Sequence, residues 1–364
     1  MKVGILTWHK AINHGAVLQA YASCEIIKVL GYDPKILNYS WNLYEDKRKL
    51  QKFFRRVKTF SPQKAIWFYH HKKLYKEKIK NFEEFVTNKL PIGKLFYEEK
   101  NLDAVYIGSD MVFDITQGYN PYMYGLGVPS NYIFSYAASF GYTTISEIKI
   151  DDHYNQIVEG LSKMKAIGYR DENTKKICEE LDISVKMTEN IDPVLCYGFE
   201  KEISAWDSKK WRGKKYILIY AYGSLINERK TISQLKKFSK EKELNIISCG
   251  YYHSWCDENI PASPQEFLEM FKYAKYVVTD TFHGTIFSLI LHKKFVTIIS
   301  KNGFKVKYLL DNIHMSDRIK KDEITKVLIQ DIDYKYYDNW IENARKKSKN
   351  FINLNLEKAQ NNNG

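Results

Sequence analysis

The stretch from Tyr276 to Ile299, YVVTDTFHGTIFSLILHKKFVTII, constrains the fold of this chain more than any other segment. It contains four parts in order: an apolar run at 276–279, a polar turn at 280–284, an apolar segment at 285–291 and a second apolar run at 295–299. Two apolar runs separated by an apolar helix are typical of buried parallel strands joined by a crossover. The stretch therefore predicts one strand–turn–helix–strand unit of an α/β fold.

The turn of this unit places His283 close to Asp280 and Gly284. In an α/β sheet such a turn lies at the carboxyl end of a parallel strand, where ligands bind, and the next helix directs free N–H groups toward it. An anion is the ligand expected there. His283 could instead cap the helix or pack in the core. Because polar and small residues interrupt two apolar segments here, we predict a polar pocket, with His283 functional and Asp280 in the cleft.

Alternating strand and helix patterns continue along the chain in two series. The first series has apolar runs at 2–8, 34–39, 103–107, 133–138, 166–169 and 185–188, and the second has them at 215–220, 245–248, 276–279 and 295–299. At 364 residues the chain is long enough for two domains. We predict an α/β protein with two doubly wound, Rossmann-like domains that face a cleft.

The predicted domain boundaries follow from this alternation. The first domain covers residues 1–196 and carries a basic helical insertion at about 42–90, and a polar linker follows at 197–213. The second domain covers 214–330 and contains the histidine turn. The last segment, 331–364, has a helical pattern that ends in Asn-rich sequence, and we expect it to return to the first domain.

The net charge of +13 is concentrated in one segment. Between Lys47 and Lys80 the chain has thirteen Lys or Arg residues, interleaved with aromatic residues, and one acidic residue, Glu77. This composition is typical of an amphipathic helix at an anionic membrane surface. A solvated helical face or a lid over the cleft is the alternative. Nucleic acid is not an expected partner, because no recognised nucleic-acid-binding motif accompanies the charge.

The cysteines indicate a reducing compartment, and the first residues have the pattern of a strand rather than of a signal peptide. The five cysteines are widely spaced, without CxxC or Cys/His metal-ligand spacing, so we predict neither disulfides nor a metal site. The start, MKVGILTW, has the pattern of a buried strand, and no apolar run approaches the roughly 20 residues that span a bilayer. GxGxxG and P-loop patterns are absent from the first turn, and we expect no cofactor. We expect a cytoplasmic protein, which the basic segment could hold at the inner face of the membrane.

Polar residues at the ends of other predicted strands are further candidates for the cleft. Those that could contact an acceptor are Asn13, Gly15 and Gln19 at the start of the first helix, and Gly108, Ser109 and Asp110 after the strand at 103–107. Arg170 ends the strand at 166–169, where it could bind a carboxylate or phosphate, or pair with Asp171 or Glu172. Lysines from 301 to 307 follow the strand after His283 and are either solvated or phosphate-binding.

Six segments of this chain, taken in order, resemble the polysaccharide pyruvyl transferase family. They are NHGAVLQAYA, IGSDMVFD, SYAASFG, YRDENT, DPVL and TDTFHGT. Each is weak alone, but the ordered set, spread over roughly residues 1–320, is specific. The resemblance implies a fold like that of GT-B glycosyltransferases. It also implies transfer of pyruvate from phosphoenolpyruvate to two hydroxyls of a sugar, as a cyclic ketal, in a bacterial surface polysaccharide or its lipid-linked precursor.

The resemblance also implies roles for particular residues. His283 would be the general acid, because ketal formation needs a proton on the methylene carbon of phosphoenolpyruvate. The phosphate and carboxylate of the donor need cations and N–H groups, and the candidates are Arg170, Lys301, Lys305 and the amides of Gly284 and Thr285. The chain departs from the family at Thr281, where many members carry arginine. Either a lysine from 301 to 307 substitutes for that arginine, or the donor differs.

Two other functions remain open from the sequence. A glycosyltransferase with a nucleotide-sugar donor would share the architecture and the anion site. A non-enzymatic protein that docks on anionic lipid, or on an assembly of polysaccharide enzymes, would explain residues 47–80 but leave the second domain without a role.

Overall fold

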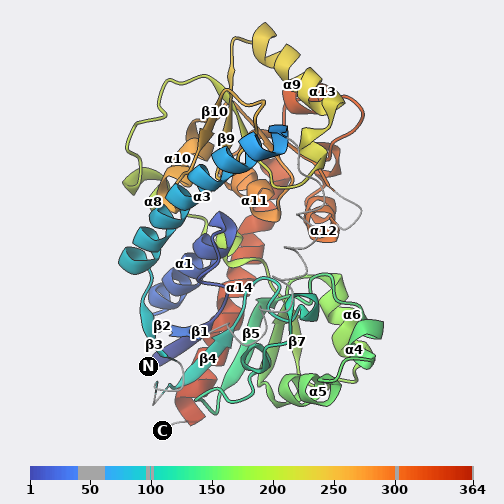
Figure 1. The fold of residues 1–364 in the computed structure, drawn as a ribbon. Coiled ribbons are helices and arrows are strands. Elements are labelled where there is room, and N and C mark those ends of the chain that lie inside the picture. The colour runs from blue at the N-terminus through green and yellow to red at the C-terminus, as the bar shows by residue number, and fades with distance from the viewer. Residues whose placement is uncertain (40–61, 96–98, 100–101, 300–302, 363–364) are drawn as a thin grey trace.

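The chain folds around two parallel β-sheets, seen in the computed structural model, which describes residues 1–39, 62–95, 99, 102–299 and 303–362 (Figure 1). The strands of the first sheet are β1 (Lys2–Leu6), β2 (Asp33–Asn38), β3 (Ile92–Leu95), β4 (Ala104–Ile107), β5 (Ile133–Ala138), β6 (Ala166–Tyr169) and β7 (Met187–Glu189). Those of the second are β8 (Tyr216–Tyr220), β9 (Asn245–Cys249), β10 (Glu258–Ile260), β11 (Tyr276–Thr279) and β12 (Lys294–Thr297). The predicted α/β class is confirmed. The sequence pattern missed the edge strands β3 and β10, because their sequences, IGKL and ENI, contain polar residues or glycine and form no apolar run.

Helices connect and cover the strands of both sheets. They are α1 (His14–Val29), α3 (Pro62–Lys89), α4 (Ile145–Lys149), α5 (Tyr154–Lys163), α6 (Glu172–Glu180), α7 (Pro193–Tyr197), α8 (Glu200–Ala205), α9 (Arg229–Glu241), α10 (Pro264–Tyr273), α11 (Phe282–Ile290), α12 (Phe304–Asn312), α13 (Ile324–Ile329) and α14 (Lys335–Asn362). The described residues also form the 3-10 helices η2 (Ile115–Gln117), η3 (Pro121–Tyr124), η4 (Leu225–Asn227) and η5 (Ser316–Arg318).

Strand β4 shows how each sheet is buried on both faces. Ala104 and Tyr106 face the core that contains α1, α7 and α14, whereas Val105 and Ile107 face the core that contains α5 and α6. Successive side chains of a strand point to opposite faces, so a strand covered on both sides must be apolar throughout. This is why the strands of this chain read as continuous apolar runs.

The strand order places two switch points in the molecule. The first sheet has the order β3-β2-β1-β4-β5-β6-β7 and the second has the order β10-β9-β8-β11-β12. The chain therefore reverses its winding direction between β1 and β4, and again between β8 and β11. Ligands of doubly wound folds bind at the carboxyl ends of the strands at such points. Asp110 follows β4 and His283 follows β11, so both lie at the expected edges.

Residues after the second sheet pack against the first sheet. Figure 1 shows α14, in red, running from the C-terminal half past the strands of the N-terminal half. Ser348 Oγ accepts a hydrogen bond of 3.2 Å from the amide of Ile191, and Phe351 packs against the ring of Tyr136. Residues 197–213, expected as a linker, include α8, and Trp211 is fully buried. One hydrophobic core joins the two halves through α1, α7, α10, α11 and α14.

Across the described ranges, no helix has both the length and the apolar character needed to cross a membrane. In the same part of the chain, histidine, cysteine, aspartate and glutamate side chains form no group of three or more that could hold a metal ion.

Candidate active site

The N-terminus of α11 is built by the threonine that precedes it. Thr281 has extended backbone (φ −112°), and its Oγ1 accepts a hydrogen bond of 2.8 Å from the amide of Gly284. The amide of Thr285 donates to the carbonyl oxygen of Thr281 at 3.2 Å. Both amides that the sequence suggested for an anion are thus engaged within the helix. Helix geometry leaves the first two amides, those of Phe282 and His283, to face a ligand.

His283 is held between α1 and the end of β7. Its imidazole Nε2 lies 3.6 Å from Oδ2 of Asp192, within ion-pair range but longer than a hydrogen bond. A Cβ atom on Gly15 would lie 2.1 Å from Nδ1 of His283, so the absence of a side chain on Gly15 allows α1 to approach the ring. Only 7% of His283 is exposed, which fixes one orientation of the imidazole.

Arg170, which follows β6, joins two carboxylates that follow β4 and β7 of the same sheet. Its Nη1 donates to Oδ2 of Asp192 at 2.7 Å and its Nη2 donates to Oδ1 of Asp110 at 2.9 Å. The guanidinium carbon lies 4.7 Å from the ring centroid of Phe282, in cation–π range. Its Nε is buried and has no hydrogen-bond partner within the described residues. Arg170 therefore pairs with distant carboxylates rather than with Asp171 or Glu172.

Lys305 brings a second cation to the cluster from α12. Its Nζ lies 3.7 Å from Oδ1 of Asp110, which is too long for a hydrogen bond, so this lysine is held less tightly than Arg170. Burial, reinforced by the charge of Arg170, lowers the pKa of Lys305 to about 8. Lys301, the other lysine candidate, lies outside the described residues.

The two carboxylates of the cluster are ionised. Burial alone would raise the pKa of Asp110, but Arg170 and Lys305 more than offset it, and the pKa lies well below its usual value. Burial likewise acts to raise the pKa of Asp192, and the nearby His283 and Arg170 reverse that effect. Two carboxylates, two cations and an imidazole therefore form one charged cluster between the two sheets.

The remaining candidates from the first half form hydrogen bonds with neighbouring residues. Asn13 caps α1 by accepting from the amide of Ala16 at 3.2 Å. The fully buried Gln19 accepts from Thr7 Oγ1 at 2.9 Å inside the first half. Ser109 donates to the carbonyl oxygen of Ala137 at 2.9 Å, which anchors the residue before Asp110.

Gly108 and Asp280 shape the two strand ends. A Cβ atom on Gly108 would lie 2.2 Å from the carbonyl oxygen of Tyr136, so a larger residue would separate β4 from β5. Asp280 accepts from the amides of Tyr222, at 2.9 Å, and Gly223, at 2.5 Å, which ties the end of β11 to that of β8. Burial raises the pKa of Asp280. Its carboxylate is committed to backbone amides at the switch point.

The structure thus brings together four of the predicted residues, His283, Arg170, Lys305 and Asp110, and adds one that sequence reasoning missed. Asp192 connects Arg170 to His283 and is fully buried at its side chain. It follows β7 as Asp110 follows β4, so the rule that polar residues after buried strands line a site could have identified it.

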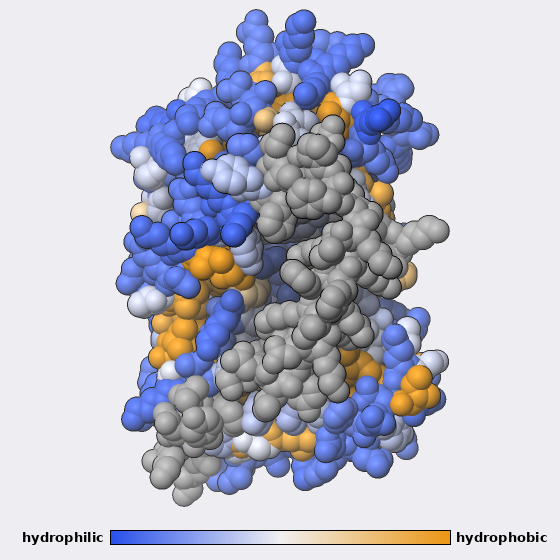
Figure 2. All heavy atoms as spheres, in the orientation of Figure 1, coloured by the Kyte–Doolittle hydropathy of each residue, from blue (hydrophilic) through white to orange (hydrophobic). Residues whose placement is uncertain are grey.

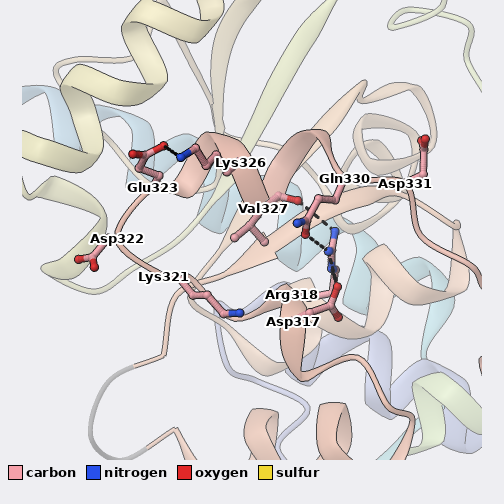
Figure 3. Close-up of a pocket in the computed structure, with 9 residues that line it drawn as sticks. All are labelled: Asp317, Arg318, Lys321, Asp322, Glu323, Lys326, Val327, Gln330 and Asp331. Carbon is pink, nitrogen blue, oxygen red and sulfur yellow. Dashed lines mark hydrogen bonds and ion pairs between the residues drawn. The ribbon is translucent and has the colours of Figure 1, made fainter.

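A hollow on the second half of the molecule offers no comparable chemistry. Figure 3 shows it beside α13, lined mainly by acidic and basic side chains. Its buried cation, Arg318, donates to the carbonyl oxygen of Val327 at 3.0 Å, to Gln330 at 2.6 Å and to Asp317. Arg318 is therefore occupied by protein partners, and we place the candidate site at the His283 cluster.

Comparison with protein families identifies the chain. A model of the polysaccharide pyruvyl transferase family matches residues 13–302, which include every member of the charged cluster except Lys305. The chain belongs to the polysaccharide pyruvyl transferase family. It is therefore a transferase, as the sequence resemblance implied. A search of curated proteins returned no match.

Solved structures with similar folds belong to the GT-B class. UDP-GlcNAc 2-epimerase from Neisseria meningitidis, bound to UDP-GlcNAc, has a TM-score of 0.53 and 10% identity, covering 98% of this chain and 100% of that one. The Methanocaldococcus jannaschii epimerase has a TM-score of 0.51 and 11% identity, covering 97% and 99%. The α,α-trehalose 6-phosphate synthase of Burkholderia multivorans has a TM-score of 0.51 and 7% identity, covering 100% and 99%. The predicted GT-B-like architecture of this pyruvyl transferase family member is thereby confirmed.

Proposed function

We propose that this enzyme transfers pyruvate from phosphoenolpyruvate to two hydroxyls of a sugar in a surface polysaccharide or its lipid-linked precursor. One observation carries the proposal: His283, at the N-terminus of α11, lies in a buried cluster with two cations, Arg170 from the first sheet and Lys305 from α12. The donor has an anionic phosphate, an anionic carboxylate and a methylene carbon that must be protonated, and the cluster supplies cations and a proton donor.

The chemistry assigns one step to each group. His283 donates a proton to the methylene carbon, which becomes a methyl group, and the central carbon becomes cationic and accepts the oxygen of one sugar hydroxyl. Departure of phosphate then allows the second hydroxyl to close the ketal ring. Each of the two sugar hydroxyls releases one proton. One of these protons returns to His283, and the other leaves with phosphate or enters the solvent. Asp192 would orient the imidazole throughout, as the carboxylate of a catalytic triad does.

The donor phosphate would bind at the helix end and the lysine. Thr281 serves as the cap of α11, so it offers no charge in place of the arginine found in many family members. Lys305 would bind the donor phosphate instead. Its contact with Asp110 is long, at 3.7 Å, and can be exchanged for a contact with a phosphate oxygen. The free amides of Phe282 and His283 would complete the anion site.

Affinity for phosphoenolpyruvate should fall as pH rises through about 8. Lys305, whose pKa is lowered to about 8, is charged below this pH and neutral above it. A hydrogen bond to a charged group is worth roughly 1.5–3 kcal/mol, so the dissociation constant should rise about ten- to thirtyfold by pH 9.5. Calorimetric titrations between pH 7 and 9.5 would measure this, because the phosphate, with its second pKa near 6, is already fully ionised there.

Lys305→Arg is the matched control for this pH dependence. Arginine stays protonated throughout the range, so the variant should bind phosphoenolpyruvate with little change between pH 7 and 9.5. Lys305→Met should bind weakly at every pH. A loss of affinity above pH 8 that is equally large in Lys305→Arg would assign the effect to another group.

We also propose that α3 contributes to an anionic membrane contact. Lys72, Lys73, Lys76 and Lys80 are exposed on this helix, as are Tyr69 (67%) and Tyr75 (41%), and Figure 2 shows hydrophilic residues along its course. The opposite side is anchored, since Lys78 donates to the carbonyl oxygen of Gly250 at 3.1 Å. Residues 47–61 of the basic segment lie outside the described residues.

Replacement of the four exposed lysines of α3 by glutamine should weaken sedimentation with phosphatidylserine vesicles at least tenfold, because each lysine near an anionic surface contributes about 1 kcal/mol. Vesicles of phosphatidylcholine alone provide the uncharged reference. The same replacement at Lys236, Lys237, Lys240 and Lys242, exposed around α9, is the control and should have little effect. Equal weakening by both sets would indicate a general charge effect and contradict a contact through α3.

A further inference from the structure

A hollow beside the charged cluster is not used by the proposed transfer of pyruvate. It lies between the end of β7, α12 and α14, and we call it the α12–α14 groove. Its volume is about 660 Å³, within the roughly 300–1,000 Å³ typical of ligand sites. It shares Glu189, Asn190, Tyr308 and Trp340 with the smaller hollow that is lined by Arg170, Asp192 and Lys305. The groove therefore adjoins the cluster.

One face of α14 forms a long side of this groove. Tyr336, Asn339, Trp340, Asn343 and Lys347 recur every three or four residues, so their side chains lie along one side of the helix. Another side of α14 is buried in the core through residues such as Tyr337, Ile341 and Ile352. Asn339 and Asn343 are exposed. The groove face is thus presented by a helix that is fixed by packing elsewhere.

The lining of the groove is polar and aromatic but carries little charge. Glu189 and Lys347 are the charged residues among those that line it, and the others include four asparagines and three aromatic residues. An asparagine amide both donates and accepts hydrogen bonds, as sugar hydroxyls do. An aromatic ring offers a flat apolar surface, which suits the C–H face of a sugar ring. A nucleotide or phosphorylated ligand needs several cations, and Lys347 is the single lysine or arginine among the lining residues.

A hydrogen bond crosses the inner end of the groove. Tyr308 on α12 donates to Oε1 of Glu189 at 2.6 Å, which joins the second half of the molecule to the end of β7. Both residues also line the hollow at the cluster, so the two spaces meet at this bond. A ligand in the groove would therefore extend away from the reacting centre while remaining continuous with it.

We propose that the α12–α14 groove binds the uncharged sugars that neighbour the modified sugar, and so selects an acceptor of several sugar units over a mono- or disaccharide. The inference rests on the proposed pyruvyl transfer and adds the place where the acceptor chain binds and a preference for acceptors of several sugar units. It needs no change in the chemistry at His283.

Saturation-transfer NMR with the whole protein tests the groove. The probes are matched di- and hexasaccharides of glucose, galactose, mannose and N-acetylglucosamine. At least one hexasaccharide should bind wild type ten times more tightly than its disaccharide. The double variant Asn339→Ala/Asn343→Ala, and separately Trp340→Ala, should lose most of that difference. Asn350→Ala, an exposed asparagine of α14 outside the groove, should retain it. Melting temperatures of all variants report whether they fold.

Three results would contradict the proposal that the groove binds neighbouring sugars. They are equal affinity for short and long saccharides, no binding by any hexasaccharide, or an unchanged length preference in the folded double variant. Titration with phosphoenolpyruvate separates this proposal from pyruvyl transfer. If wild type binds phosphoenolpyruvate but shows no length preference, the groove proposal alone fails. If wild type shows the length preference but does not bind phosphoenolpyruvate, the proposed donor is wrong and the proposed role of the groove is retained.

Discussion

His283→Ala is expected to lower the turnover of phosphoenolpyruvate with a saccharide acceptor about a hundred- to ten-thousandfold, the range for loss of a positioned general acid. The imidazole lies 3.6 Å from Asp192 in the charged cluster, and the proposed mechanism takes the proton for the methylene carbon from this ring. Arg170, Lys305 and the helix amides remain, and binding of phosphoenolpyruvate should therefore persist. Phosphate release measures turnover, and calorimetry measures donor binding.

His292→Ala is the control for this variant. His292 follows α11 at its other end, where its exposed imidazole pairs with Asp338. Its removal should leave phosphate release unchanged. Normal turnover by a folded His283→Ala protein would exclude His283 as the acid, whereas loss of both turnover and donor binding would make it a binding residue.

Asp192→Ala is expected to destabilise the fold by about 3–5 kcal/mol, because it leaves Arg170 buried with one carboxylate fewer. The side chain of Asp192 is fully buried, and it holds Arg170 at 2.7 Å. Its Oδ1 also accepts from the amide of Val194 at 2.9 Å and so caps α7. Urea denaturation followed by circular dichroism measures the loss. Asp331→Ala removes the exposed partner of Lys294 and should change the midpoint little.

Asp192→Asn separates the charge of this residue from its cap. Asparagine caps helices as well as aspartate does, so this variant should be more stable than Asp192→Ala. Because the pKa of Asp192 is lowered in the folded protein, its charge stabilises the fold above the unfolded pKa of about 3.9 and loses that effect as pH falls through the folded value. The stability difference between wild type and Asp192→Asn should therefore shrink below about pH 4. A difference that is constant with pH would contradict the charge assignment.

The sequence predicted the parallel sheets because strands buried on both faces must be apolar throughout, and this signal is local. It did not predict β3 or β10, whose positions at the sheet edges need few apolar residues. It also treated residues 197–213 as a linker, although Trp211 is buried there against the second half. Burial of an isolated residue depends on distant elements and has no local periodicity.

The site was predictable where a residue follows a strand and unpredictable where roles depend on packing. Arg170 and Asp110 lie where the strand ends placed them, and the structure adds their shared contact. Gly15 and Gln19 are close in sequence, but one lies against His283 and the other forms hydrogen bonds inside the first half. The orientation of α1, which is fixed by tertiary packing, determines which of its residues lies against His283. Thr281 could be recognised as a cap only once the amide of Gly284 had been located.

The identity of the donor is the central claim, and calorimetric titration of wild type at pH 7 with phosphoenolpyruvate and, separately, with uridine and guanosine diphosphates tests it most directly. The account predicts that phosphoenolpyruvate binds and the nucleoside diphosphates do not, because the anion site at α11 has a proton donor and two cations but no assigned nucleotide contact. Binding of a nucleoside diphosphate without binding of phosphoenolpyruvate would contradict it and would indicate a nucleotide-sugar transferase on the same fold.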